Sequence, residues 1–195
     1  MNMMAEISKA DIFSRLRSGE AVPMDDPDYY KVREAAARAL SIQVDLNASR
    51  TTDEIRSHLS ILTKRVVDES TIVMTPFSIN YGKNLELGKN IFINQNCQFL
   101  DFGGIRIDDD VLIAPGVMLL TEGHPLAASK RKYLQSKPIH IKRNAWIGAG
   151  AIVLGGVTVG ENAMVAAGSV VTSDVPDDVV VAGSPAQIVK EVPQS

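Results

Sequence analysis

The sequence predicts an all-β main domain, a parallel β-helix of six-residue repeats, with an α-helical cap before it and a short C-terminal helix or tail after it. The first observation behind this fold class is a period of six. Aliphatic residues occupy every sixth position in the C-terminal half: Ile141, Ile147, Val153, Val159, Val165 and Val171. This period matches neither a helix, at about 3.6 residues, nor a lone strand, at about 2, and it is typical of short strands stacked in coils.

The second observation is that the same period occurs earlier in the chain. It runs through two further sets of three residues: Leu87, Ile93 and Phe99, then Ile107, Ile113 and Leu119. Asparagine and glycine recur between the aliphatic positions, and they tolerate the positive φ that tight corners need. Asp108 and Lys142 stand where such a repeat usually has glycine, so we expect distorted corners there. We therefore place the β-helix over residues 67–184.

The third observation is that the period breaks twice. The step from Phe99 to Ile107 is eight residues, which fits a small bulge or short loop. The step from Leu119 to Ile141 is twenty-two residues, which requires an inserted loop over residues 120–138. A loop of this length in a compact domain is usually functional or disordered. The breaks are therefore the first places to look for a site.

Residues 1–66 predict helices, not repeats. A short amphipathic helix containing Asp11 ends at Gly19, and Asp26 and Pro27 provide an N-cap and a first helical residue for the next helix. That helix is expected to present an apolar face that includes Tyr30, Val32, Ala36, Leu40 and Val44. Thr51 to Glu54 form a capping box before a third helix. These helices would cover the apolar end of the first coil. Residues 185–195 form the C-terminal helix or tail.

Composition narrows the class of protein. The chain has 195 residues, a net charge of −3 and a pI near 5.6, which argues against a nucleic-acid partner bound through a basic surface. No apolar run approaches the ~20 residues that span a bilayer. The first twenty residues contain charges and no apolar signal-peptide core, so we expect a cytoplasmic protein. Cys97 is the single cysteine and is expected to be a buried hydrophobic residue.

Three histidines are candidates for chemistry. His124 lies at the start of the inserted loop, where Pro125 favours an extended backbone, and a neutral imidazole can take a proton from a hydroxyl. His58 lies in a predicted cap helix and His140 points outward from a strand, so both are expected to be structural. A zinc site built from histidines is an alternative, but it needs ligands that converge in space.

Several segments together resemble the maltose/galactoside O-acetyltransferase family. They cover nearly the whole chain: Tyr81–Gly88, Asn94–Cys97, Ala114–Val117, Gly123–Pro125, Asn144–Gly150, Gly156–Gly160, Ala167–Thr172 and Ala182–Ala186. The helical N-terminal segment also resembles that of the family. The repeat alone is common to many acyltransferases, whereas His124-Pro125 and the block around Trp146 are more specific.

This resemblance implies a left-handed β-helix and a homotrimer with active sites between neighbouring subunits. It implies acetyl-CoA as donor, a sugar or sugar-like hydroxyl as acceptor, and no metal. His124 would be the general base for direct attack on the thioester, with no acetyl-enzyme, and a backbone N–H near Ala149 would stabilise the oxyanion.

The resemblance also implies binding residues. For the acceptor these are Asn94, the weaker match Asn80, and an acidic residue of the cap, Asp25 or Asp26. For CoA, four residues match the pantetheine groove, and Lys190 is the clearest cation for the phosphates, with Lys142 and Arg143 as weaker candidates. The four groove residues are Trp146, Ala149, Ala167 and Thr172.

Four positions depart from the family pattern. Phe92 stands where galactoside-type members have Tyr, and Phe102 where they have an acidic acceptor contact, so polar groups are lost near the acceptor. Ser173 and Gln187 occupy positions that are often basic. The identity of the acceptor therefore stays open. The leading hypothesis is a hydroxyl of a sugar or sugar-like molecule, and the alternative is an amine, an antibiotic hydroxyl or an amino-acid hydroxyl. A non-catalytic trimeric scaffold is the alternative outside enzymes.

Overall fold

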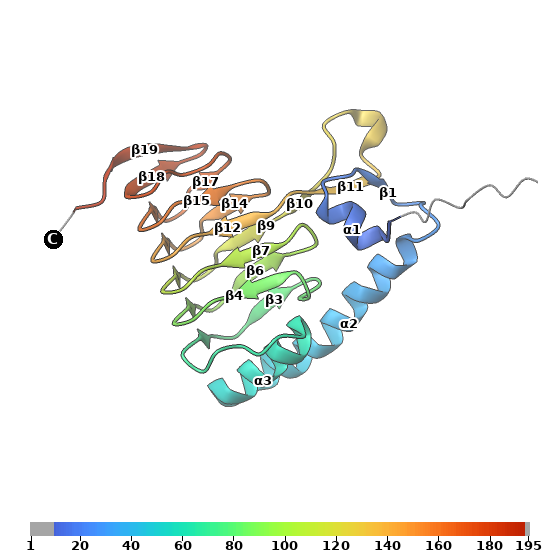
Figure 1. Ribbon diagram of the computed structural model, residues 1–195, viewed down its shortest axis with the longest axis horizontal. Helices are drawn as coiled ribbons and strands as arrows, with labels where there is room; N and C mark the ends of the chain where they lie inside the picture. Colours follow the sequence, from blue (N-terminus) through green and yellow to red (C-terminus); the bar gives the residue numbers. More distant parts are fainter. Residues whose placement is uncertain (1–9, 194–195) are drawn as a thin grey trace, which may run out of the picture.

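A computed structural model describes residues 10–193 and confirms the predicted parallel β-helix (Figure 1). Three parallel sheets stack coil on coil. The first sheet contains β2 (Ile72–Val73), β5 (Phe92–Ile93), β8 (Leu112–Ile113), β13 (Trp146–Ile147), β16 (Met164–Val165) and β18 (Val179–Gly183). The second contains β3 (Phe77–Ile79), β6 (Cys97–Leu100), β9 (Met118–Leu120), β14 (Ile152–Leu154) and β17 (Val170–Val171). The third contains β4 (Leu85–Leu87), β7 (Ile105–Ile107), β12 (Ile139–Ile141) and β15 (Thr158–Val159).

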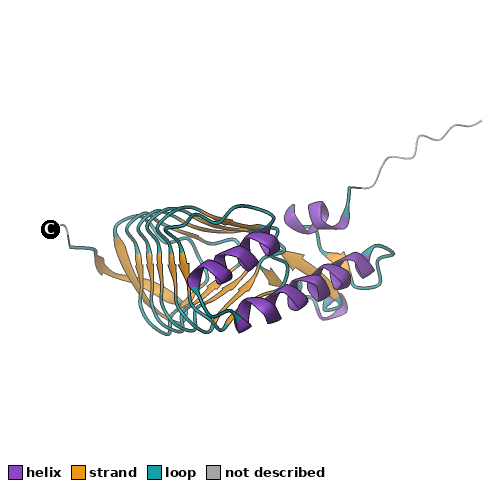
Figure 2. Ribbon diagram, turned by 90° about the horizontal axis from the view of Figure 1, so that it is seen from below, coloured by secondary structure: helices purple, strands orange, loops and turns teal. Residues whose placement is uncertain are grey.

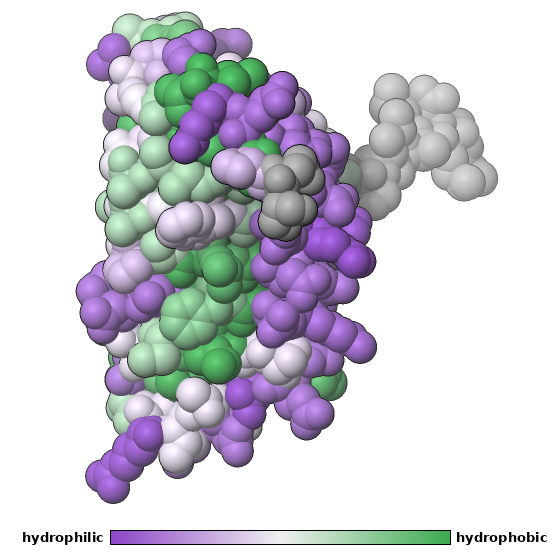
Figure 3. All heavy atoms as spheres, turned by 90° about the vertical axis from the view of Figure 1, so that its left-hand side faces the viewer, coloured by the Kyte–Doolittle hydropathy of each residue, from purple (hydrophilic) through white to green (hydrophobic). Residues whose placement is uncertain are grey.

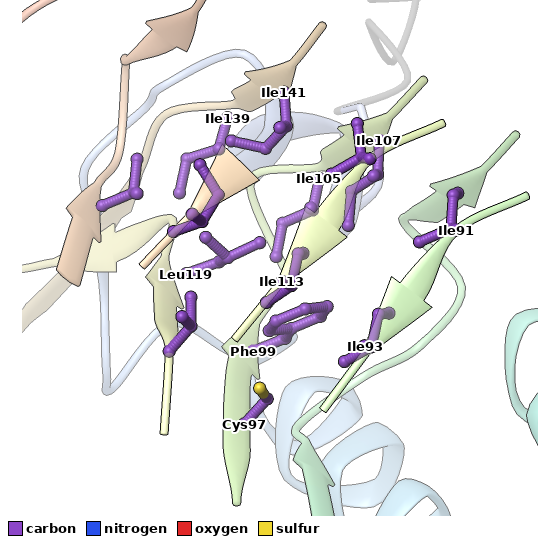
Figure 4. Close-up of a cluster of buried hydrophobic side chains, with 14 of the residues drawn as sticks. Ile91, Ile93, Cys97, Phe99, Ile105, Ile107, Ile113, Leu119, Ile139 and Ile141 are labelled. Carbon is purple, nitrogen blue, oxygen red and sulfur yellow. The ribbon is translucent and has the colours of Figure 1, made fainter. Parts of the chain in front are cut away.

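The six-residue period produces the core because it places aliphatic residues at equivalent positions of neighbouring coils, where they lie side by side. Ile93 pairs with Ile113, Ile113 with Ile147, and Ile147 with Val165, and all four side chains are buried. Figure 4 shows Ile93 and Ile113 among the inward side chains gathered between the strands, with Cys97 close by. Burial of the Cys97 thiol raises its pKa, so it stays a neutral apolar group.

Most corners between the third and first sheets use a left-handed residue. Asp110 and Asn144 have φ of 64° and 56°, and Asn144 Nδ2 donates to Asn162 Oδ1 of a neighbouring coil at 2.8 Å. The distortion expected at Asp108 and Lys142 is absent, since neither has a positive φ. Their N–H groups still belong to the ladder, so the chain turns two residues later than the sequence suggested.

The cap contains α1 (Ile12–Arg17), α2 (Tyr29–Ala48) and α3 (Thr52–Thr63). The predicted cap at Thr51 is confirmed, because its side chain accepts the Glu54 N–H at 3.2 Å. The predicted cap at Asp26 is wrong. Helix α2 begins at Tyr29 after Asp28, and the Asp26 carboxylate instead binds Arg15 Nη1 at 2.8 Å in a buried ion pair.

The cap packs on two separate parts of the molecule (Figures 1 and 2). Helix α3 and the end of α2 join the β-helix core through Leu46, Leu59 and Leu62. Helix α1 and the start of α2 form a second apolar cluster with Leu134 of the inserted loop and with Tyr81 and Phe102 of the coils. The expected apolar face of α2 is partly wrong. Val32 is buried as expected, but Tyr30, Leu40 and Val44 are exposed. The helix instead buries Tyr29, Ala39 and Leu46 beside Val32. The cause is the direction from which α3 and the coils contact the helix.

The inserted loop and the C-terminus are both more regular than expected. The insert contains β10 (Glu122–Gly123), a 3-10 turn η1 (Ala128–Lys130) and β11 (Tyr133–Ser136), which pairs antiparallel with β10 and with β1 (Val22–Pro23). At the C-terminus, strand β19 (Ala186–Glu191) replaces the predicted helix or tail. It pairs antiparallel with β18 after a turn at Gly183, whose φ is 103°, and so covers an otherwise open sheet edge. No helix in the described part of the chain is both long and apolar enough to cross a membrane.

The spacing between coils leaves no room for a side chain at Gly148. A Cβ there would lie 2.6 Å from both Ala167 N and Val165 O of the next coil, whereas a Cβ at Gly123 would meet nothing within 4 Å. We expect Gly148→Ala to lower the free energy of unfolding by about 1–3 kcal/mol, measured by chemical denaturation. Gly123→Ala is the control. Equal stability of the two variants would contradict this account of coil packing.

Candidate active site

His124 follows β10 on the inserted loop, with an exposed ring. It lines a pocket of about 340 Å³ together with Glu122, Ser136 and Lys137 of the insert and with Leu154 and Gly155 of the next coil. This places His124 at the corner between the second and third sheets. The break in the six-residue period is therefore where the structure builds a cavity, as the sequence predicted.

One hydrogen bond orients the His124 ring. Its Nδ1 lies 2.7 Å from the main-chain oxygen of Tyr133. Because a carbonyl oxygen can only accept, Nδ1 carries the hydrogen in the neutral ring and Nε2 keeps its lone pair. Nε2 is the atom that can take a proton from a substrate, so the arrangement fits the predicted general base.

The helical cap fixes the position of the insert residues that orient His124. The sequence did not indicate this role of the cap. Strand β1 pairs Pro23 with Tyr133, the residue whose carbonyl receives the His124 hydrogen. Ser136 Oγ donates to the Leu16 carbonyl at 2.7 Å, and Gln135 Nε2 donates to the Gly19 carbonyl at 3.0 Å. The cap therefore fixes the inserted loop as well as covering the first coil. No local signal could have revealed this, since the partners lie more than a hundred residues apart.

Phe102, predicted to shape the acceptor side, contributes to this cap contact, and its influence on the acceptor stays a prediction. It is 4% exposed and stacks on Tyr81 with ring centroids 5.0 Å apart. Phe13 of α1 stacks on Tyr81 from 4.9 Å. The aromatic ring at position 102 therefore packs inside this cluster, at a position where the family pattern has an acidic residue.

Asn80, predicted to bind the acceptor, has internal partners for both ends of its amide. Its Oδ1 accepts the Asp101 N–H at 2.9 Å, and its Nδ2 donates to Glu122 Oε2 at 2.8 Å. Glu122 Oε1 accepts the Phe102 N–H at 2.8 Å. Burial raises the pKa of Glu122 to about 7, against the lowering effect of these hydrogen bonds.

Asp101 is a buried structural carboxylate beside this group. Its oxygens accept three backbone N–H groups, from Tyr81, Gly82 and Asn84, at 2.9–3.1 Å. Burial raises its pKa to about 6 in spite of these bonds. The short break after Phe99 is thus closed by a turn that Asp101 stabilises.

Three predicted binding residues, Asn94 for the acceptor and Ala149 and Ala167 for CoA, lie at a different corner from His124. All three follow strands of the first sheet. Ala149 and Ala167 are in adjacent coils, whereas the coil that contains β8 separates Asn94 from Ala149. The Gly168 N–H donates to the Ala149 carbonyl at 2.8 Å. Ala149 and Ala167 are exposed. Within one chain, the structure does not bring these residues to His124.

Trp146 lies on the outer face of the first sheet, in a row of apolar side chains. It pairs with Leu112, which pairs with Phe92, and both Trp146 and Leu112 are 49% exposed. Figure 3 shows apolar side chains gathered in a band along this side of the solenoid, bordered by hydrophilic residues. Phe92 therefore belongs to an outer apolar face of the coils.

The other predicted residues are accessible but separated. Thr172 is exposed after β17, and Lys190 is exposed on β19 opposite Val180. In the cap, Asp25 is exposed, in contrast to the ion-paired Asp26. Their roles stay predictions.

The remaining histidines lie away from the pocket. His58 lies on α3, and His140 on the third sheet contacts Asp108 Oδ2 through Nε2 at 2.8 Å. Among residues 10–193, no three His, Cys, Asp or Glu side chains gather so as to hold a metal ion.

Comparison with known proteins shows similarity to hexapeptide-repeat transferases and to acetyltransferases. Residues 138–173 match the family model of the bacterial transferase hexapeptide, six repeats. The chain is 41% identical over 128 residues to the galactoside O-acetyltransferase of Escherichia coli K12, a match covering 65% of this chain and 63% of that protein. It is 35% identical over 174 residues to a predicted acetyltransferase of Saccharomyces cerevisiae, covering 86% and 85% of the two chains.

Solved structures extend the similarity over the whole fold. A maltose O-acetyltransferase of Clostridium difficile 630 superposes with a TM-score of 0.86 at 29% identity, over 93% of this chain and 97% of that one. A galactoside acetyltransferase in complex with coenzyme A gives 0.80 at 31% identity, over 92% and 90%. A hexapeptide-repeat acetyltransferase of Vibrio cholerae complexed with acetyl-CoA gives 0.81 at 32% identity, over 93% and 98%.

The coils and the histidine on the insert therefore define a hexapeptide-repeat acyltransferase scaffold. Within this class, the chain belongs to the maltose/galactoside O-acetyltransferase family.

The raised pKa of Glu122 has a consequence for stability. Its pKa in the folded chain, about 7, lies above its ordinary value of 4.5, so protonation stabilises the fold at low pH and this stability is lost as pH rises through about 7. A glutamine does not titrate. We expect the melting temperature of Glu122→Gln minus that of wild type to increase from pH 5 to pH 8, measured by differential scanning calorimetry. A difference that is constant with pH would show that the carboxyl is not perturbed.

Proposed function

We propose that this protein is an acetyl-CoA-dependent O-acetyltransferase that moves an acetyl group to a hydroxyl of a sugar or sugar-like acceptor, with His124 as general base. The observation that carries the proposal is the hydrogen bond from His124 Nδ1 to the Tyr133 carbonyl, which leaves Nε2 as a proton acceptor in an open pocket. The family of the chain supports the donor and the class of reaction.

In the proposed mechanism both substrates bind before reaction. His124 Nε2 takes the proton of the acceptor hydroxyl while the hydroxyl oxygen attacks the carbonyl carbon of the thioester. The C–S bond of the tetrahedral intermediate then breaks, and the imidazolium returns its proton to the departing sulfur of CoA. No acetyl-enzyme forms.

The corner around Ala149 fits the thioester end of the donor. Ala149 and Ala167 are exposed, and a Cβ on Gly150 or Gly168 would meet nothing within 4 Å, so an open shelf of small residues lies beside Trp146. Within the described part of the chain, the Ala149 N–H has no hydrogen-bond partner. Such a fixed donor is suited to stabilise an oxyanion.

This assignment requires a second copy of the chain. His124 and Ala149 lie at different corners of one β-helix, so a complete site forms where the His124 corner of one subunit meets the Ala149 corner of the next. The exposed apolar row that includes Leu112 and Trp146 supports burial of this side in an assembly. We propose the homotrimer implied by the family.

Removal of the base should abolish transfer. We expect His124→Ala to lower kcat by about 10²–10⁴-fold while acetyl-CoA still binds. Release of free CoA thiol over a panel of sugars, amines, antibiotics and amino-acid hydroxyls measures turnover, and calorimetry measures donor binding. His58→Ala, at a half-buried position on α3 that does not line the His124 pocket, is the control. Wild-type turnover in His124→Ala would contradict the assignment of the base, and a wild-type protein that does not bind acetyl-CoA would favour the scaffold alternative.

Mixed trimers test whether the site is shared. We expect His124→Ala and Ala167→Arg to be inactive separately and to regain part of the activity when co-refolded, because some interfaces then combine an intact His124 with an intact Ala167. Light scattering should report a mass near three times 21.1 kDa for each preparation. Absence of complementation in confirmed mixed trimers would place the whole site within one chain.

A further inference from the structure

Glu122 lies two residues before His124 but has no role in the mechanism above. Its carboxyl joins the start of the inserted loop to two turns: to the turn after β3 through the Asn80 amide and to the turn after β6 through the Phe102 N–H, both at 2.8 Å. Because only Gly123 separates Glu122 from His124 along the chain, a shift of β10 at Glu122 also displaces the backbone of His124. The group is therefore placed to control the position of the base.

The polarity of this group allows only one arrangement. Two backbone donors stand at its ends, the Asp101 N–H facing Asn80 and the Phe102 N–H facing Glu122. The side chains of Asn80 and Glu122 must each direct an oxygen toward its backbone N–H. The two atoms that face each other between the side chains must then share one hydrogen, with one atom as donor and the other as acceptor. One amide and one carboxylate satisfy this condition.

Protonation of Glu122 weakens the arrangement. A hydrogen on Oε2 competes with the Asn80 amino group, and a hydrogen on Oε1 competes with the Phe102 N–H. The neutral carboxyl that remains is also a weaker acceptor than the carboxylate, so the two hydrogen bonds hold β10 less firmly, although the neutral form avoids the cost of a buried charge.

We propose that Glu122 is a positioning residue whose ionised carboxylate holds the strand before His124 in place, and that its protonation disables the base. The proposal rests on the function of His124 proposed above. The raised pKa of the Glu122 carboxyl brings this change into the range near neutral pH.

The charged and titratable surroundings of Glu122 are few. Asp101 faces it from the turn after β6 and raises its pKa further. Tyr29 faces it from α2, with the Arg33 guanidinium 5.6 Å from the centre of the Tyr29 ring. Among the described residues, no lysine or arginine forms an ion pair with Glu122, so no cation holds it in the charged form.

Three variants at two positions test the proposal. Glu122→Gln leaves two amides and a donor–donor contact, and we expect kcat to fall by about 10–100-fold with an unchanged KM for acetyl-CoA. Asn80→Asp leaves two carboxylates that need a shared proton, so activity should fall most at high pH. The double variant Asn80→Asp/Glu122→Gln restores one amide and one carboxylate with their positions exchanged, and should regain most of the activity.

The pH profile of kcat separates positioning from a merely structural role. In wild type and in the double variant, the acid limb should fall with a slope approaching about 2, because His124 and one carboxylate must both lose a proton. In Glu122→Gln the slope should be about 1. Glu86→Gln on β4 is the matched control. This variant loses ion pairs with Arg65 and Arg17 and should leave the profile unchanged.

A measurement without turnover keeps this test separate from the proposed function. Nitrogen chemical shifts of ¹⁵N-histidine should report His124 with hydrogen on Nδ1 in wild type. The His124 signals should change in Glu122→Gln and return in the double variant, while those of His58 and His140 stay fixed. Unchanged His124 signals and kcat in a folded Glu122→Gln variant, or a double variant no better than the single ones, would overturn the proposal. Altered signals in a protein that acetylates nothing would support the positioning role and reject the catalytic function.

Discussion

The close stacking of parallel coils constrains everything else in this molecule. Each strand pairs with the coil before and the coil after it, so a position in one coil faces its equivalent in the next. Ile93, Ile113, Ile147 and Val165 form one such column. Where the backbones approach most closely, as at Gly148, even a methyl group does not fit. Extra residues must therefore leave the stack, and the inserted loop does so while β12 rejoins β7 in register.

This insert would be a poorly supported hairpin without the cap. Strand β1 extends its small sheet, Ser136 and Gln135 donate to carbonyls of the α1 region, and Leu134 enters the second apolar cluster. The same contacts fix the Tyr133 carbonyl that selects the His124 tautomer. Capping the solenoid and orienting His124 are thus one packing arrangement, in which α2 links the first coil to the insert.

The proposed site divides its work between two corners of the β-helix. One corner supplies a base on a supported loop, and the other supplies small exposed residues and an apolar outer row. Such a division makes activity depend on assembly. It also separates the group that must be placed accurately, His124, from the regular coils, so its position depends on local polar contacts such as those of Glu122 and Asn80.

Much of the fold could be predicted from the sequence because the six-residue repeat is a pattern of residues that are close together in the chain. The period of six fixes the direction of each side chain, so the coils, the buried Cys97 and the place of the insert followed from it. The Thr51 cap is likewise a signal within four residues. Predictions that depended on distant contacts did less well. Asp26 pairs with Arg15 instead of capping α2, Leu40 and Val44 are exposed, and residues 186–191 form a strand.

The same difference between local signals and distant contacts applies at the candidate site. The sequence by itself determined the β-helix, its interruptions and His124 as the residue to examine, because periodicity and turn chemistry are written in consecutive residues. Only the tertiary structure decided that Asn80 is bound to Glu122, that Phe102 is buried against Tyr81, and that His124 and Ala149 lie at different corners. These facts depend on hydrogen bonds and packing between residues about twenty to more than a hundred positions apart, whose geometry exists only once the coils have stacked.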